Sequence, residues 1–170
     1  MTTTTPSVYN YSIAQWKTYF FALIFIIGNL IFPQLAHLVP MGGLIFLPIY
    51  FFTLIGAYKY GIWVGLLTAI LSPLANSLFF GMPPVPSLPA ILLKSVMLAV
   101  AAAYMAKKFG RVHFLAVLLA VIAYQIVGMS FEWIYKGSLS AALQDIRIGY
   151  PGLAFQIFGG YLVLLALKKL

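Results

Sequence analysis

Long apolar runs are the feature that most limits how this chain can fold. Only 7% of its residues are charged and 64% are hydrophobic, whereas a water-soluble domain carries roughly 25% charged residues. Such a chain cannot cover a surface that faces water, and a lipid bilayer is the solvent that suits its side chains. We therefore predict an all-α, polytopic integral membrane protein.

Clusters of proline, glycine and charge divide the sequence into six apolar runs. A transmembrane helix needs about 20 apolar residues, with a range of about 17–25. We predict six spans in one domain, 12–170, after a polar segment, 1–11, that lacks the pattern of a secretory signal. Pro33 is expected to end the first span, and the second is short and interrupted by Pro48. The predicted spans are 12–32, 43–58, 61–80, 88–106, 112–130 and 151–167.

The charged residues predict the orientation of these spans. An even number of spans puts both termini on one side of the membrane. That side would carry seven basic residues and no acid: Lys17, Lys59, Lys107, Lys108, Arg111, Lys168 and Lys169. Because basic residues of short loops stay in the cytoplasm, we expect both termini to be cytoplasmic. The opposite side would hold Lys136 and Arg147 with both acids of the chain, Glu132 and Asp145.

Lys94 is a cation within the fourth predicted span. It lies about six residues from the outer end of that span, or roughly 9 Å at 1.5 Å per residue. Ionisable residues inside a membrane are functional candidates by default. The structural alternatives are a lysine that reaches the outer headgroups, or an ion pair with Glu132 or Asp145.

The fifth and sixth runs add polar groups to the same outer half. Gln125, Gly128 and Glu132 follow each other at i, i+3 and i+7, which places them on one helix face. Glu132 and Lys136 are also i, i+4 neighbours, so an ordinary ion pair is the simpler interpretation of that pair. Gln156 stands among glycines in the last run, where glycine also serves close helix packing.

Two further residues fit either a pocket or a structural role. Asn76 is the strong polar group in the outer half of the third run, and its amide suits a neighbouring helix as well as a ligand. Trp133 lies where an outer aromatic belt is expected, and a pocket for a ring-bearing ligand would use the same residue type.

Small residues at every fourth position predict close helix contacts. Such ladders serve packing within the bundle or docking of a partner, and their spacing does not separate the two uses. The first run carries Ala14, Thr18 and Ala22, and the third carries Gly61, Gly65 and Ala69.

Several chemistries lack their usual residues. The chain has no cysteine, which excludes disulfides and thiolate metal sites, and no P-loop motif for ATP. His37 and His113 have no partner at metal-ligand spacing, and no catalytic set of Ser, His and Asp is present. We expect no metal, no cofactor, no nucleic acid partner and no enzymatic activity.

A proline-rich motif lies between the third and fourth runs. It reads SPLAN at 72–76, GMPPVP at 81–86 and LP at 88–89. Together with six spans and a short basic loop between the fourth and fifth, it resembles the substrate-binding S components of energy-coupling factor (ECF) vitamin transporters. The topology covers almost the whole chain, and the motif covers about residues 72–95.

The resemblance implies a mechanism. An S component lies in the inner membrane of a prokaryote and binds a vitamin or related micronutrient in a pocket open to the outside. It then docks on a transmembrane coupling subunit driven by two cytoplasmic ATPases and topples to release its cargo inward. Docking in that family uses an Ala-x3-Ala pattern on the first helix, for which this chain has the Ala14, Thr18, Ala22 ladder.

The resemblance also implies a pocket built by the outer halves of helices four to six. Many relatives carry a glutamate near the position of Lys94, so the reversed charge implies a carboxylate-bearing cargo. We expect Lys94 and Arg147 to bind the anion, Gln125 and Gln156 to donate or accept hydrogen bonds, and Trp133 to stack. The alternative function is a small structural or assembly subunit without a ligand. The predicted site comprises Lys94, Gln125, Glu132, Trp133, Arg147, Gln156 and Asn76.

Overall fold

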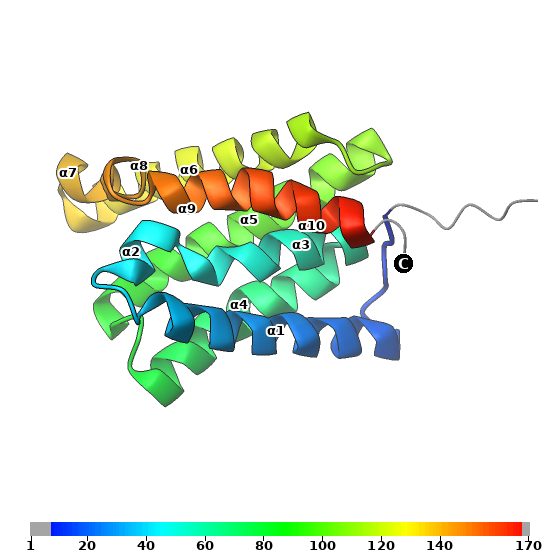
Figure 1. Cartoon of the computed structure of the whole chain (residues 1–170), viewed down its shortest axis with the longest axis horizontal. Coiled ribbons are helices and arrows are strands. Elements are labelled where there is room, and N and C mark those ends of the chain that lie inside the picture. The colour runs from blue at the N-terminus through cyan, green and yellow to red at the C-terminus, as the bar shows by residue number, and fades with distance from the viewer. Residues whose placement is uncertain (1–7, 168–170) are drawn as a thin grey trace, which may run out of the picture.

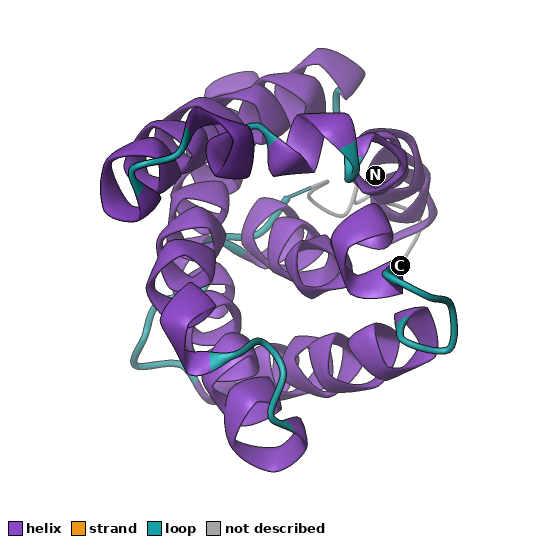
Figure 2. Ribbon diagram, turned by 90° about the vertical axis from the view of Figure 1, so that its left-hand side faces the viewer, coloured by secondary structure: helices purple, strands orange, loops and turns teal. Residues whose placement is uncertain are grey.

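The structure, a computed structural model, describes residues 8–167 and consists there of helices joined by short loops (Figures 1 and 2). In chain order these are α1 (Trp16–Ala36), α2 (Gly42–Phe46), the 3-10 turn η1 (Pro48–Tyr50), α3 (Phe51–Tyr60), α4 (Ile62–Phe80), the 3-10 turn η2 (Val85–Ser87), α5 (Leu88–Phe109), α6 (Phe114–Lys136), α7 (Leu139–Ala142), α8 (Gln144–Arg147), α9 (Tyr150–Ala154), the π-helical turn η3 (Phe155–Gly159) and α10 (Gly160–Leu167).

Helices long and apolar enough to cross a membrane make up most of the fold. Within residues 8–167 there are five of them, and each is 18 to 25 residues long. They are α1, α4, α5 with the preceding turn η2, α6, and the continuous run of α9, η3 and α10. The all-α fold predicted from the sequence is confirmed for the described residues, and the five long apolar helices fit a multi-pass membrane protein, whereas six uninterrupted spans are not found.

The second predicted span, 43–58, is broken in the structure. Leu47 adopts the left-handed conformation (φ 46°, ψ 48°) and separates α2 from η1 and α3. The remaining α3 has ten residues, or about 15 Å, which is half of the roughly 30 Å hydrocarbon core. The interruption predicted at Pro48 is therefore found, one residue earlier, but the run that follows it is too short to be a span.

A central position explains why a short, interrupted helix is tolerated. All residues of α3 except Phe52 are buried, and the helix packs against α1, α4, α5 and α10. Figure 2 views the bundle from the end that carries α7 and α8, and shows a helix enclosed by the others. Irregular backbone at membrane depth is stable where protein surrounds it. The sequence of α3 is therefore mostly apolar because protein encloses the helix, and not because the helix spans a membrane.

The end of α1 also differs from the prediction. The helix does not stop at Pro33 but continues through it to Ala36. Proline lacks the N–H that would bond the carbonyl four residues earlier, which here belongs to Asn29. The Asn76 side chain repairs that loss, because its Nδ2 donates to the Asn29 carbonyl at 2.7 Å.

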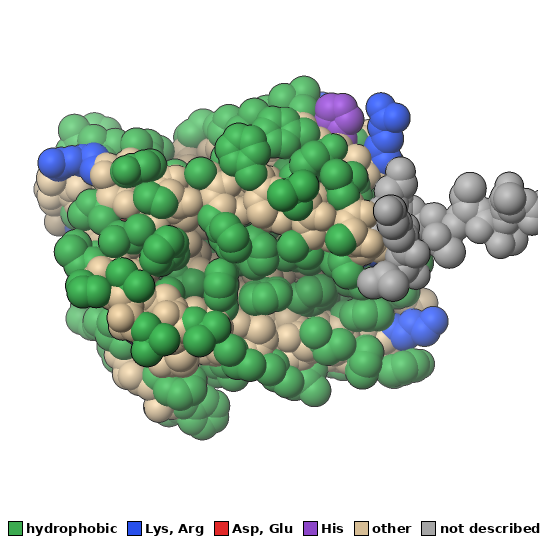
Figure 3. Space-filling view, in the orientation of Figure 1, with side chains coloured by type: hydrophobic (Ala, Val, Ile, Leu, Met, Phe, Trp, Pro, Cys, Tyr) green, Lys and Arg blue, Asp and Glu red, His purple; other side chains and the backbone are tan. Residues whose placement is uncertain are grey.

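The helices place both ends of the described chain at one end of the bundle (Figure 1). A cavity lined by Val8, Tyr9 and Lys107 joins the start of the chain to the end of α5, and Lys17 lies in the first turn of α1. In Figure 3, hydrophobic side chains cover the middle of the visible face, and the basic side chains gather at its two ends. Lys168 and Lys169 lie outside the described residues.

The small-residue ladders serve contacts within the bundle. Thr18 and Ala22 are buried on α1. Gly65 of α4 faces α3 so closely that a Cβ there would lie 2.9 Å from Ala57 Cα. Gly61, in the turn between these helices, has φ of +102°, a conformation that glycine adopts without strain. Of the six positions predicted for partner docking, Ala14 alone is exposed; Thr18, Ala22, Gly61, Gly65 and Ala69 are buried.

Candidate functional site

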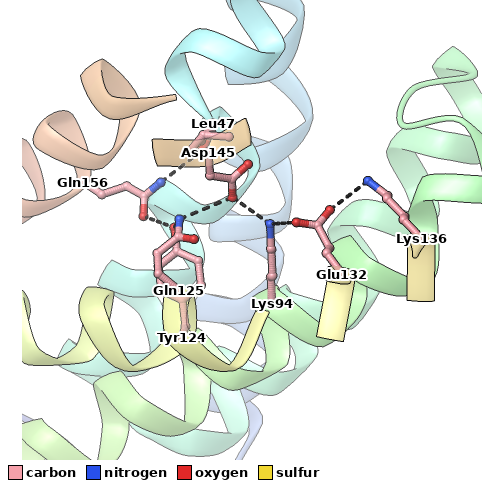
Figure 4. A network of polar contacts seen from close by, with 8 residues as sticks. All are labelled: Leu47, Lys94, Tyr124, Gln125, Glu132, Lys136, Asp145 and Gln156. Atoms are coloured by element: carbon pink, nitrogen blue, oxygen red, sulfur yellow. Dashed lines mark hydrogen bonds and ion pairs between the residues drawn. The ribbon is translucent and has the colours of Figure 1, made fainter. Parts of the chain in front are cut away.

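A buried ionic network lies at the end of the bundle opposite the chain ends (Figure 4). The Lys94 ammonium, from α5, donates to Glu132 Oε2 of α6 and, at 2.8 Å, to Asp145 Oδ2 of α8. Glu132 Oε1 in turn accepts a bond from Lys136 Nζ at 2.9 Å. Two cations therefore balance both acids of the chain, and the predicted i, i+4 pair of Glu132 and Lys136 is confirmed.

Close packing of α5 on α6 makes room for Lys94. Its side chain is 2% exposed and lies across Gly128 of α6, where an added Cβ would overlap the lysine stem and lie 2.8 Å from its Cε. A buried ion pair is stable only when geometry and further hydrogen bonds compensate for lost hydration. Gly128 supplies the space, and two carboxylates supply the compensation.

The network continues into neutral side chains. Gln125 Nε2 donates to Asp145 Oδ2 at 3.3 Å and to the Tyr124 hydroxyl at 3.0 Å. The Tyr124 hydroxyl donates to Gln156 Oε1 at 2.8 Å, and Gln156 Nε2 reaches the carbonyl of Leu47 at 3.5 Å. Within the described part of the chain, Gln125 Oε1 is the buried side-chain oxygen or nitrogen that has no hydrogen-bond partner.

Short elements outside the regular spans hold several of these groups. Asp145 lies on the four-residue helix α8, Gln156 lies in the π-helical turn η3, and Leu47 is the left-handed residue after α2. Gly152 allows α9 to lie directly on the Phe46 backbone, since a Cβ there would overlap it. The network thus ties the segments 42–47 and 139–154, at this end of the bundle, to α5 and α6.

The predicted site residues separate into three groups. Lys94, Gln125, Glu132 and Gln156 meet in the network. Trp133 is 54% exposed, and Arg147 is exposed and donates to Ser140 Oγ at 3.2 Å. Asn76 belongs to a different cluster.

Sequence reasoning left three side chains of the network out of the predicted site. Lys136 was expected only as the ion-pair partner of Glu132, as found. Asp145 was considered as a structural partner of Lys94 and not as a site residue. The chain has only two acids, and their expected position on the same side as the buried Lys94 could have indicated that both belong to the site. Tyr124 precedes Gln125 and is fully buried, but nothing in the pattern of apolar residues separates it from ordinary core tyrosines.

Asn76 lies in an uncharged network between the central helices. Besides the Asn29 carbonyl, its Nδ2 donates to the Ser72 carbonyl at 3.0 Å, and its Oδ1 accepts from Gln34 Nε2 at 3.4 Å. The Asn29 amide donates to Thr53 Oγ1 and Ser72 Oγ at 3.1 and 3.3 Å. The helices α1, α3 and α4 are joined by these bonds.

A cavity of about 490 Å³ opens near the ionic network. One wall is the motif turn after α4, where Ser77 Oγ donates to the Pro83 carbonyl at 2.9 Å. The rest of the lining comes from the segment 33–49, from Ser87 and from Ile91 of α5. The lining residues are Pro33, His37, Val39, Pro40, Met41, Gly42, Gly43, Leu44, Pro48, Ile49, Asn76, Met82, Pro83, Pro84, Ser87 and Ile91.

A second cavity, of about 500 Å³, lies at the other end of the bundle. The segment 8–11 forms its edge and is fastened to the end of α3, because Tyr9 N and Tyr11 N donate to the carbonyls of Lys59 and Tyr60 at 2.7 and 3.1 Å. The Lys59 ammonium lies 4.9 Å from the centre of the Tyr9 ring. This end is thus covered by its own chain.

The histidines are separate from each other in the structure. His37 lines the cavity of about 490 Å³, and His113 Nδ1 accepts a bond from Leu115 N at the start of α6. Among residues 8–167 no three His, Cys, Asp or Glu side chains form a group that could hold a metal ion.

No family model, curated protein or solved structure matches the chain.

Proposed function

We propose that this protein is a membrane-embedded binding subunit for uptake of a vitamin or related micronutrient, similar to the S component of an ECF transporter. One observation carries the proposal. The residues of the proline-rich motif, Asn76 and Met82 to Pro84, wall a cavity of about 490 Å³. Small-molecule sites typically have volumes of about 300–1,000 Å³ and mostly apolar linings, and this cavity meets both criteria.

The proposed orientation puts the cavity on the outer face of a prokaryotic inner membrane. The opposite end carries Lys17, Lys107, Lys108 and Arg111, and basic residues favour the cytoplasmic side. In this arrangement the cargo would enter from outside, and both chain ends would be cytoplasmic. The subunit would have no enzymatic activity of its own.

Release of the cargo would require docking on a coupling subunit driven by two ATPases. The exposed apolar face of α1 is the surface that we propose for this contact, since five positions of the two small-residue ladders are used inside the bundle. Ala14 is next to that face, which includes Trp16, Tyr19, Phe20, Leu23, Ile24 and Ile27.

The buried polar side chains favour a second candidate, a structural or assembly subunit without a ligand. Lys94, Gln156 and Asn76 all bond to other groups of the same chain. A carboxylate-bearing cargo would therefore have to displace Glu132 or Asp145 before it could reach Lys94. The structural candidate predicts no small molecule bound at micromolar affinity.

Native mass spectrometry of the gently purified protein separates these functions. A micronutrient that co-purifies at one copy per chain, or a vitamin that raises the midpoint of thermal unfolding in a saturable way, is expected for the binding subunit. An empty protein that no member of a vitamin panel stabilises would overturn the proposal in favour of the structural subunit.

A further inference from the structure

The lining of the cavity of about 490 Å³ is largely apolar. Among the described residues, those that line it include no Lys, Arg, Asp or Glu. Its polar groups are the His37 ring, the Ser87 hydroxyl and the Asn76 amide, and the rest of the lining is apolar. An ionised group placed there would lose hydration without gaining a paired charge, which is strongly unfavourable.

The nearest cation on α5 does not change this balance. Lys94 lies one helical turn beyond Ile91, but its ammonium is turned towards Glu132 and Asp145 and is absent from the cavity lining. Arg147, the other cation expected to bind an anion, is exposed and bonds to Ser140. Neither residue is available to a molecule inside the cavity.

The Asn76 side chain is fixed within the wall of the cavity. Both of its Nδ2 bonds go to backbone carbonyls, of Asn29 and Ser72, and its Oδ1 accepts a bond of 3.4 Å from Gln34 Nε2. Asn76 is fully buried, so the accessible polar side chains of the lining are those of Ser87 and His37.

Both walls are held in place in the absence of a ligand. Ser77 fixes the turn at Pro83, and Gly42 packs on the backbone of Ala36 so tightly that a Cβ would overlap it. The left-handed residues Met41 and Leu47 flank α2, and such backbone outliers concentrate at functional sites. Preformed walls lower the ordering cost of binding.

We propose that the cavity binds an uncharged, largely apolar small molecule that contacts the Ser87 hydroxyl or the His37 ring. This assignment rests on the proposed binding function and refines its cargo class. It replaces the carboxylate that Lys94 suggests when the sequence is considered alone.

Matched pairs of acids and amides test the charge preference. The probes are nicotinate with nicotinamide, biotin with biotinamide and lipoate with lipoamide, titrated against the full chain in lipid nanodiscs by thermal shift and calorimetry. For any pair that binds, we expect the amide to bind at least tenfold more tightly. Tighter binding of the acid would overturn the cargo class while leaving the binding function intact. If no probe binds and no small molecule co-purifies, the binding function itself fails.

Variants locate the site of the bound probe or co-purified ligand. Ile91→Trp fills the cavity and should weaken binding at least tenfold, whereas the matched control Ile122→Trp, on an exposed position of α6, should leave affinity unchanged. Ser87→Ala tests the hydroxyl without filling the space and should weaken binding severalfold. Arg147→Gln should have no effect. Loss of binding in Arg147→Gln with unchanged binding in Ile91→Trp would place the ligand elsewhere, and a lipid that the amides cannot displace would equally overturn the proposal.

Discussion

Two buried polar networks lie in this bundle, and they differ in charge and in what they connect. The neutral network joins α1, α3 and α4 through Asn29, Ser72 and Asn76, and it repairs the carbonyl that Pro33 leaves without a donor. The charged network joins α5 and α6 to the short helix α8 through Lys94, Glu132 and Asp145. The first joins two long helices to the central helix α3, and the second fastens the short helix α8 to α5 and α6.

The difference predicts unequal responses to mutation. When a buried neutral group loses its partner, one hydrogen-bonding group is left unsatisfied, which lowers the free energy of unfolding by about 1–3 kcal/mol. When one partner of a buried ion pair is removed, an uncompensated charge remains, which lowers the free energy of unfolding by about 3–5 kcal/mol. The charged network should therefore be the more sensitive of the two to loss of a single residue, although it holds the less regular part of the fold.

Lys94→Met should give the largest effect. It strands Glu132 and Asp145 in a buried site with no cation from α5, and the expected loss of stability is about 3–5 kcal/mol. The measurement is the midpoint of thermal unfolding in nanodiscs, followed by tryptophan fluorescence.

Neutralising the stranded acids is the control for this variant. The triple variant Lys94→Met, Glu132→Gln, Asp145→Asn should regain most of the lost stability, because replacing a whole buried ion cluster is often neutral. If the single and triple variants are equally unstable, the unpaired charge of the two acids is not the cause of the loss.

Gly128→Ala should give the next largest effect. The added methyl group overlaps the Lys94 stem, and displacing a buried lysine between two carboxylates costs about 1–3 kcal/mol, the usual range for overpacking. Gly159→Ala is the matched control, since its Cβ would meet only the edge of the Phe155 ring at 3.2 Å. Equal unfolding midpoints for the two variants would show that Lys94 moves aside without penalty.

The sequence predicted the ingredients of this site better than their arrangement. Helical spacing correctly put Gln125, Gly128 and Glu132 on one face, because that periodicity is local. The contact of Asp145 with Lys94 depends on how α8 folds back over α5, and 51 residues separate the two. No local sequence pattern predicts a contact between residues that lie so far apart in the chain.

The fold was predicted correctly where it depends on local sequence and incorrectly where it depends on contacts between distant residues. Most span boundaries follow from apolar length, so α4, predicted at 61–80, was found at Ile62–Phe80. α3 is apolar because it is central, and hydropathy does not separate a helix buried in protein from one in lipid. Pro33 was expected to end α1, but a side chain 43 positions later supplies the donor that lets the helix continue.

Asn76→Ala tests the neutral network. It leaves the Asn29 carbonyl buried without its donor, and we expect a loss of about 1–2 kcal/mol in unfolding experiments. Ser130→Ala is the control, because that exposed hydroxyl bonds only to Ile126 of its own helix and should change stability by less than about 0.5 kcal/mol. A loss as large as that of Lys94→Met would remove the contrast between the two networks.

Gln125→Leu should have the smallest effect, and it sharpens the comparison within the charged network. The substitution removes the donor to Asp145 and Tyr124, but it also removes the unpartnered Oε1, whose burial is unfavourable by about 1–3 kcal/mol. The two terms oppose each other, so stability should change by less than about 1 kcal/mol. Gln156→Leu is the matched comparison, because both ends of that amide are bonded and its loss has no such compensation. If Gln125→Leu proves as destabilising as Gln156→Leu, then Oε1 is bonded in the membrane, to a water or a ligand donor, and the charged network extends beyond the side chains of this chain.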